Sequence, residues 1–274
     1  NTKHKQLSFI GRNKNLNFRL FFEKLLNKLI VNKIALKLFG FKYASHFFIA
    51  GGSQSGARGP LINAKTKLMH IHASNYDIYL KHKNLELTED YILYLDQYIP
   101  FHSDFLFNNQ NNTFEVNEYY QNLRFLFNNI ERAYGLKVMI AAHPKANYED
   151  KPGLFGDRVI KQGIVSSSKV IINAKMILQH ATMTLSLCVL FKKPIIFLTS
   201  SSFNNTLEGS IINAYANYFN TIPLDCKADL SNINAHFADM NKYNEYVDAV
   251  VKMNGTNDES FWTQISNTIK KINN

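Results

Sequence analysis

Two apolar runs in this sequence end in side chains that could act on a sugar or a phosphate. Asp96 follows the mostly apolar run YILYL, and His143 follows the run KVMIAA. A carboxylate can serve as a base for an incoming hydroxyl or as a nucleophile, and an imidazole can donate to a leaving oxygen. We therefore take Asp96 and His143 as candidate catalytic residues. Capping or ion pairing for Asp96 and a turn role for His143 are the structural alternatives, and Asp104 competes with Asp96.

A third stretch places a polar cluster just before an apolar helix. Residues 177–197 read ILQHATMTLSLCVLFKKPIIF. Hydroxyls at a helix start either cap the helix or bind an anion together with unpaired backbone N–H groups. Capping needs only one hydroxyl, so the cluster favours an anion ligand. The candidate ligand-binding residues are Gln179, His180, Thr182, Thr184 and Ser186, together with Pro144 and Lys145 beside His143.

The sequence lacks the spacings that usually hold a catalytic metal. It has no Asp-x-Asp pair of the kind that holds a divalent ion on a nucleotide diphosphate, and no His/Cys cluster with zinc spacing. His70 and His72 alternate along one expected strand, but a third ligand is missing. We therefore expect chemistry that needs no metal.

The elements that must position these residues alternate between strands and helices from residue 90 onward. Strands are expected within residues 91–100, 136–145, 169–181 and 193–201, and helices over 118–134 and 182–191. Such alternation predicts an α/β fold with a parallel sheet covered on both sides. Ligands of these sheets bind beyond the carboxyl ends of the strands, so the three polar stretches should meet in one cleft.

The preceding part of the chain reads as a smaller α/β region. Two short strands, at 46–50 and 67–71, flank the loop GGSQSGARG, which lacks the Lys-Ser/Thr of a phosphate-binding P-loop. A turn and a substrate loop both remain open for this segment. The expected domains are residues 1–86 and 87–274. Near the end, ESFWTQISNTIKKINN predicts an amphipathic helix with Trp262 in the core.

Positive charge is concentrated at the start of the chain. The net charge is +10, and residues 1–43 hold ten Lys or Arg and one acidic residue. Residues 18–39 have helical periodicity, with one face formed by Lys24, Lys28, Lys33 and Lys37. This face is either a solvated surface or a contact with an anionic membrane. Nucleic acid is not an expected partner, because interleaved stacking aromatics and a known binding module are missing.

Two further features of the composition bear on location. The chain has only two cysteines, too few for a disulfide framework, and no apolar stretch of roughly 18 residues that could span a membrane. We expect a cytoplasmic protein.

The segments YILYLDQYIPFHSDF, KVMIAAHPK and IINAKMILQHATMTLSLCVLFKKPIIFLTSS together resemble the C-terminal half of bacterial capsule and lipopolysaccharide glycosyltransferases of GT-B architecture. The resemblance covers roughly residues 67–274 and includes Kdo transferases and GT-B sialyltransferases. It implies two Rossmann-like domains facing a cleft, with the N-terminal part here short or truncated. His143, Pro144 and Lys145 match a His-Pro motif near the nucleotide phosphate. The matched hydroxyl cluster is Thr182, Thr184 and Ser186, and Asp96 matches an aspartate that resembles a nucleophile in retaining members.

This resemblance implies a metal-independent glycosyltransferase that uses a nucleotide-sugar donor as substrate. CMP-Kdo or CMP-sialic acid would be the preferred donor, and a lipid-linked or oligosaccharide glycan the acceptor. The basic segment would bring the enzyme to the inner face of the bacterial inner membrane. A UDP-sugar epimerase or glycerophosphate transferase of the same fold, and a non-catalytic adaptor of polysaccharide assembly, are the alternatives.

Overall fold

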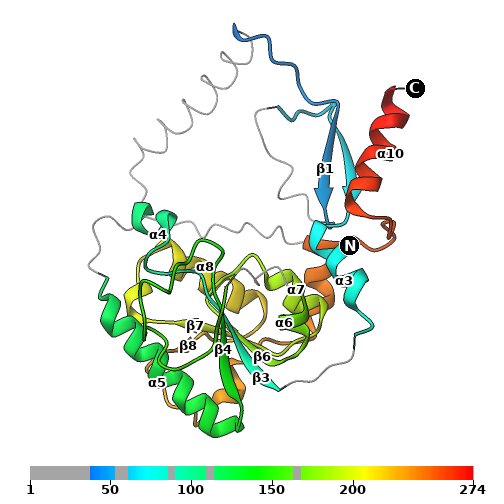
Figure 1. Ribbon diagram of the computed structural model, residues 1–274. Helices are drawn as coiled ribbons and strands as arrows, with labels where there is room; N and C mark the ends of the chain where they lie inside the picture. The colour runs from blue at the N-terminus through cyan, green and yellow to red at the C-terminus, as the bar shows by residue number, and fades with distance from the viewer. Residues whose placement is uncertain (1–37, 53–60, 86–89, 109–113, 163–167, 274) are drawn as a thin grey trace. The chain divides into compact units, whose positions relative to one another are not determined.

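The computed structural model describes residues 38–52, 61–85, 90–108, 114–162 and 168–273, which belong to two compact units (Figure 1). Unit 1 combines residues 1–74 with residues 248–274, and unit 2 consists of residues 75–247. This division differs from the expected domains, 1–86 and 87–274, because the end of the chain returns to the first unit. Gly52 N–H donates to the Asp248 carbonyl at 2.7 Å, and Ala73 N–H donates to the Val251 carbonyl at 2.6 Å.

Unit 2 is built on a six-stranded parallel sheet, which confirms the predicted α/β class. Its strands are β3 (Tyr91–Leu95), β4 (Lys137–Ala141), β5 (Ile160–Lys161), β6 (Ala174–Gln179), β7 (Ile195–Thr199) and β8 (Leu224–Asp225). They lie in the order β5-β4-β3-β6-β7-β8, and every pair is parallel. This is the Rossmann order, in which the chain changes direction across the sheet between β3 and β6.

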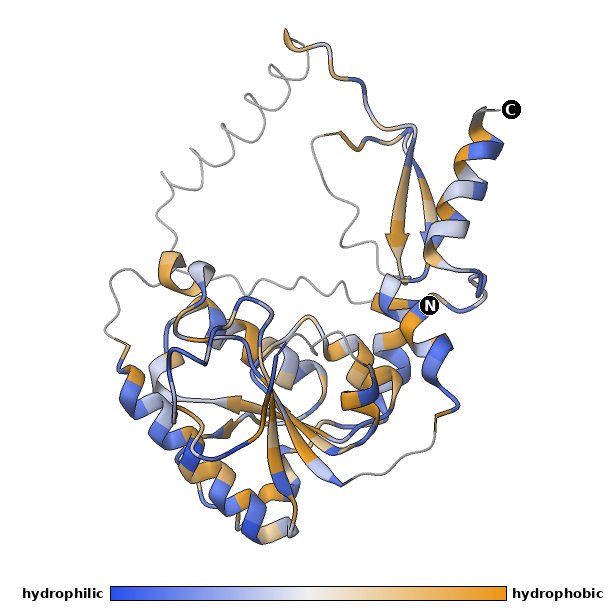
Figure 2. Ribbon diagram, in the orientation of Figure 1, coloured by the Kyte–Doolittle hydropathy of each residue, from blue (hydrophilic) through white to orange (hydrophobic). Residues whose placement is uncertain are grey.

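The central strands are mostly buried because the sheet is covered on both faces. Most residues of β3, β6 and β7 are buried and apolar, with Lys175 of β6 as an exposed exception, and hydrophobic colour predominates along these strands in Figure 2. The long helix α5 (Val116–Tyr134) instead alternates, with Tyr119, Leu123, Phe127 and other apolar residues buried at helical spacing. It ends at Gly135, whose positive φ of 66° lets its N–H bond to the Glu131 carbonyl.

The remaining helices of unit 2 are short, except for α8. They are α3 (Ser74–His82), α4 (Ser103–Asn108), α6 (Ser168–Ile172), α7 (Leu185–Leu190), η3 (Ser201–Phe203), α8 (Leu207–Tyr218), η4 (Ile233–His236), α9 (Lys242–Tyr246) and η5 (Val247–Val251), with α3 and η5 crossing the unit boundary. The strand expected within residues 169–181 is β6. Residues 168–172 ahead of it form α6, where Ile171 and Ile172 are buried, because packing overrides the strand preference of these β-branched residues.

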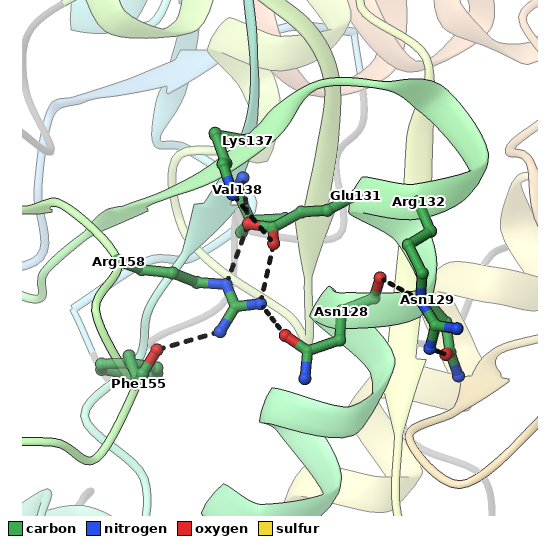
Figure 3. Close-up of polar contacts among 8 residues, drawn as sticks. All are labelled: Asn128, Asn129, Glu131, Arg132, Lys137, Val138, Phe155 and Arg158. Carbon is green, nitrogen blue, oxygen red and sulfur yellow. Dashed lines mark hydrogen bonds and ion pairs between the residues drawn. The ribbon is translucent and has the colours of Figure 1, made fainter.

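A polar cluster ties α5 to β4 and to the loop that follows β4 (Figure 3). The Arg158 guanidinium donates to both carboxylate oxygens of Glu131, at 3.1 Å each, and to Asn128 Oδ1 at 2.6 Å. Glu131 also accepts the Val138 N–H at 2.9 Å. The side chains of Arg158 and Glu131 are only 9% and 14% exposed, so this fork is shielded from water.

Replacing Arg158 with alanine is expected to lower the free energy of unfolding by about 1–3 kcal/mol, since Glu131 would lose its bidentate partner in a shielded site. Urea denaturation measures this effect. Arg132→Ala is the matched control: this arginine, also at α5, bonds Asn128 and Asn129 at exposed sites and should cost less than about 0.5 kcal/mol. Equal effects of the two substitutions would contradict a stabilising role for the Arg158 fork.

Unit 1 pairs two parallel strands and carries the last helix. The strands β1 (His46–Ala50) and β2 (Lys67–Ile71) and the helix α10 (Phe261–Asn273) confirm three predictions. The His72 ring lies 2.7 Å from the Glu259 carbonyl and so links β2 to the segment before α10. Trp262 is 73% exposed, so the prediction that it belongs to the core was wrong. Within the described residues, no helix combines the length and apolar character needed to span a bilayer.

Candidate functional site

A cavity of about 690 Å³ lies within unit 2, next to the carboxyl ends of β3 and β6. This is the point where the strand order reverses, the usual ligand position in such sheets. The loops after β3, β4 and β6 contribute Asp96, Gln97, His143, Pro144, Thr182 and Thr184 to its wall. The structure therefore brings together residues from all three polar stretches. Its size suits a small-molecule ligand.

Asp96 lies at the wall of this cavity but is only 3% exposed. Its Oδ1 accepts the Tyr98 N–H at 2.9 Å, and its Oδ2 accepts the Tyr148 hydroxyl at 2.7 Å and the His143 N–H at 3.3 Å. The Gln97 N–H is a further donor. An ionised carboxylate offers about four lone-pair positions, so these donors occupy all of them.

Burial decides the acidity of Asp96. Loss of solvent raises the pKa of its carboxyl to about 6, even though the Tyr148 hydroxyl and three backbone N–H groups act in the opposite direction. A carboxyl with this pKa is ionised in most molecules at pH 7 and still basic enough to accept a proton. The hydrogen bonds from the His143 N–H and the Tyr148 hydroxyl to Asp96 also join the loop after β4 to the loop after β3.

His143 presents one ring nitrogen to its own turn. Its Nδ1 accepts the Lys145 N–H at 3.2 Å, so the neutral ring carries its proton on Nε2. The rings of His143 and His102 meet edge to face, with centroids 5.0 Å apart. Burial lowers the pKa of His143, and His102 and Lys145 lower it further, so this imidazole is neutral at pH 7. It is therefore a hydrogen-bond donor at the cavity wall.

Gln97 fixes the distance between the two loops at the switch point. Its Nε2 donates to the Ala181 carbonyl at 2.7 Å, and its Oε1 accepts the Ala181 N–H at 2.9 Å. Through these two hydrogen bonds, the Gln97 side chain continues the pairing of β3 with β6 beyond the end of the sheet. Gln97 stood next to Asp96 in the sequence, but only the tertiary contact with Ala181 shows this role.

The hydroxyl cluster divides into residues at the cavity and residues behind it. Thr182 and Thr184 line the cavity, and Thr182 Oγ1 donates to Gln179 Oε1 at 2.8 Å. Gln179 is fully buried and supports the turn from behind. Ser186 is buried in α7, where its hydroxyl accepts the Asn75 side-chain amide at 2.7 Å. The predicted helix begins at Leu185 rather than at Thr182, because residues 182–184 form a turn.

His180 is part of the core of unit 2 and does not line the cavity. Its Nδ1–H donates to the Leu198 carbonyl at 2.8 Å, and its Nε2 accepts the Tyr119 hydroxyl at 2.7 Å. Burial lowers the pKa of His180 to about 4, so the ring stays neutral. Both nitrogens are used in packing the sheet, which leaves this residue no contact for a ligand.

Several expected residues stand apart from the cavity. Lys145 is exposed, and its side chain is not part of the wall. Four predicted membrane residues lie outside the described part of the chain: Lys24, Lys28, Lys33 and Lys37. The side chain of Asp104 lies outside it as well. Within the described part, no three His, Cys, Asp or Glu residues come together in a way that could hold a metal ion.

The sequence reasoning missed the residues that approach from other elements. His102 lies just before α4, in the segment that follows β3. Asn75 and Ile78 come from α3, and Leu207 and Glu208 come from the first turn of α8. Thr206 caps α8 by accepting the Gly209 N–H at 3.0 Å. A threonine followed by Glu208 is a recognisable helix-start signal, so α8 could have been found from the sequence. That α8 reaches the cavity depends on the fold.

The comparisons with known proteins give one distant likeness. No protein-family model matches the chain, and no curated protein matches its sequence. Among solved structures, it is similar to the UDP-GlcNAc 2-epimerase from Methanocaldococcus jannaschii, with 14% sequence identity and a TM-score of 0.41. The match covers 90% of this chain and 74% of that one. Neither value assigns a family or an activity to the chain.

Proposed function

We propose that this protein is a glycosyltransferase that moves a sugar from a nucleotide-activated donor, by preference a CMP-sugar, to a bacterial surface glycan. The observation that carries the proposal is the cavity at the switch point of the sheet, whose wall includes Asp96, His143 and Thr184. GT-B architecture, with unit 2 as the nucleotide-binding part, belongs to the same proposal. Support from the sequence is the resemblance of the three polar segments to capsule and lipopolysaccharide transferases.

The donor phosphate would lie between the His143 turn and the turn after β6. Among the described residues of the cavity wall there is no Lys or Arg, so neutral donors must hold the phosphate. His143 Nε2–H and the Thr184 hydroxyl would donate to its oxygens. A bound phosphate also favours the imidazolium form of His143, whose pKa is lowered in the free protein. Binding should therefore take up a proton and strengthen as the pH falls.

The transfer itself needs one base. The acceptor oxygen would form a bond to the anomeric carbon while the bond from that carbon to the phosphate oxygen breaks, and the phosphate leaves with the electron pair. Asp96 would take the acceptor proton, since its pKa of about 6 suits a base at neutral pH. The longest of its hydrogen bonds, 3.3 Å from the His143 N–H, is the one that substrate would replace. His143 would hold the leaving phosphate.

The acceptor would be a lipid-linked or oligosaccharide glycan at the inner face of the bacterial inner membrane. The basic face of residues 18–39 would bring the enzyme to this anionic surface through Lys24, Lys28, Lys33 and Lys37. No cofactor takes part in the proposed reaction, because the nucleotide-sugar is itself the substrate.

Calorimetry of CMP, UDP and GDP without added metal tests the proposal. We expect micromolar CMP binding that is tighter at pH 6 than at pH 8 and falls at least about tenfold in the double variant His143→Ala, Thr184→Ala, since two phosphate donors are lost. Asn213→Ala, an exposed substitution on α8, is the control and should bind like the wild type.

The outcome of this titration also separates the alternatives. A clear preference for UDP would contradict the CMP-sugar assignment and favour a UDP-sugar epimerase or a glycerophosphate transferase. Binding of none of the three nucleotides would contradict a nucleotide-dependent enzyme and favour an adaptor of polysaccharide assembly. Retained affinity in the double variant would move the donor site away from the cavity.

A further inference from the structure

Helix α10 carries exposed apolar side chains along one side. Trp262, Ile269 and Ile272 are 73%, 46% and 41% exposed, and Ile265 is partly exposed. With 3.6 residues per turn, these four side chains occupy a sector of about 80° on the helix. We call them the α10 stripe. A surface helix of a globular protein normally buries such a sector, so the stripe is unusual.

Side-chain hydrogen bonds of the helix come from a polar edge next to the stripe. Gln264 is 7% exposed, and its amide donates to the carbonyls of Asn257 at 3.1 Å and Glu259 at 2.6 Å. Thr268, one turn later, donates to the Gln264 carbonyl at 2.9 Å. These bonds do not involve the stripe, so its exposed surface is available to another molecule.

The charge beside the stripe indicates the chemistry of that surface. Lys270 and Lys271 are exposed in the last turn of α10, and the helix contains no acidic residue. Without residues 1–43, unit 1 holds six Lys or Arg against three Asp or Glu, whereas unit 2 holds fifteen against seventeen. A complementary partner is therefore anionic as well as apolar.

We infer that α10 lies on an anionic lipid surface, with the stripe inserted between the headgroups and Lys270 and Lys271 against lipid phosphates. Tryptophan and isoleucine on one side of a helix and lysines on its polar side are the composition of an interfacial helix. This contact is separate from the basic segment at residues 18–39 and does not depend on the reaction proposed for the cavity. It assigns a membrane-facing role to the C-terminal helix.

Trp262 is the single tryptophan of the chain, so its fluorescence reports on the stripe directly. The full-length protein would be titrated with vesicles of phosphatidylglycerol and phosphatidylcholine, and with phosphatidylcholine alone. We expect the emission to shift to the blue with the anionic vesicles only, and lipids brominated on their acyl chains to quench it. The shift should persist when Lys24, Lys28, Lys33 and Lys37 are replaced by glutamine, although overall binding weakens.

Two variants test the parts of the inference. Ile269→Ser with Ile272→Ser should lower the vesicle affinity about tenfold or more and reduce the blue shift, and Lys270→Gln with Lys271→Gln should remove the preference for anionic lipid. Ile222→Ser, which removes a 64% exposed side chain from unit 2, is the matched control and should leave binding unchanged. Circular dichroism checks that each variant keeps its helix content.

Three results would overturn the inference. The Trp262 emission could already be blue-shifted without lipid and unchanged by vesicles or by brominated lipids. This result would mean that another part of the chain covers the stripe. A blue shift that depends on protein concentration without lipid would mean that a second copy covers it. Equal binding to neutral vesicles would remove the role of the lysines. None of these readouts involves a nucleotide, so failure here is distinct from failure of the proposed function.

Discussion

Replacing Gly209 with alanine is expected to lower the free energy of unfolding by about 2–4 kcal/mol, although alanine ordinarily stabilises a helix relative to glycine by up to about 1 kcal/mol. Gly209 lies in the first turn of α8, and a Cβ at this position would be 2.2 Å from the Phe203 carbonyl oxygen. That oxygen belongs to the backbone, so no side-chain rotation can relieve the overlap. Either η3 or the first turn of α8 must move.

Thermal and urea unfolding of Gly209→Ala measure the loss of stability. Leu207 and Glu208 from the same turn line the cavity, so nucleotide affinity should fall together with stability. Asn213→Ala, exposed one turn further along α8, is the control and should be neutral or slightly stabilising. A stable Gly209→Ala variant with normal affinity would contradict the close packing of η3 against α8.

Replacing Asp96 with asparagine is expected to reduce sugar transfer by about 10²- to 10⁴-fold, because asparagine cannot take the acceptor proton. The substitution should also change how stability depends on pH. The folded pKa of Asp96, about 6, lies above the ordinary value of 3.8, so the folded state binds this proton more tightly than the unfolded state. The wild type therefore loses about 2 kcal/mol of this contribution as the pH rises from 4 to 6, out of about 3 kcal/mol over the whole titration. Asparagine does not titrate and avoids this loss.

Urea titrations at several pH values between 4 and 7.5 measure the difference between Asp96→Asn and the wild type. The variant should gain relative stability across this window, even if lost hydrogen bonds lower its stability at every pH. Tyr148→Phe is the companion variant, because removing this donor raises the pKa of Asp96 and should shift the acidic limb of the pH–rate profile upward. A flat difference between pH 4 and 6 would contradict a buried carboxyl with a raised pKa.

The sequence by itself determined the class of the fold and the edge of the sheet where the cavity lies. Uninterrupted apolar runs such as YILYL and IIFLT specify strands buried on both faces, and such strands belong to parallel sheets. The carboxyl ends of parallel strands share one edge, so Asp96, His143 and Thr184 had to approach one another once the strands were neighbours. Local apolar patterning and strand direction are enough for this prediction.

Only the tertiary structure decided what each polar residue does at that edge. Asp96 and His180 both directly follow buried strands, yet one lies at the cavity wall and the other bonds Tyr119 and Leu198 inside the core. The partners of both residues come from distant parts of the chain. The hydrogen bonds of Gln97 with Ala181 and of His72 with Glu259 also join residues far apart in the sequence. Burial and long-range hydrogen bonds fix the pKa and the accessibility of a side chain, and neither is encoded in the residues next to it.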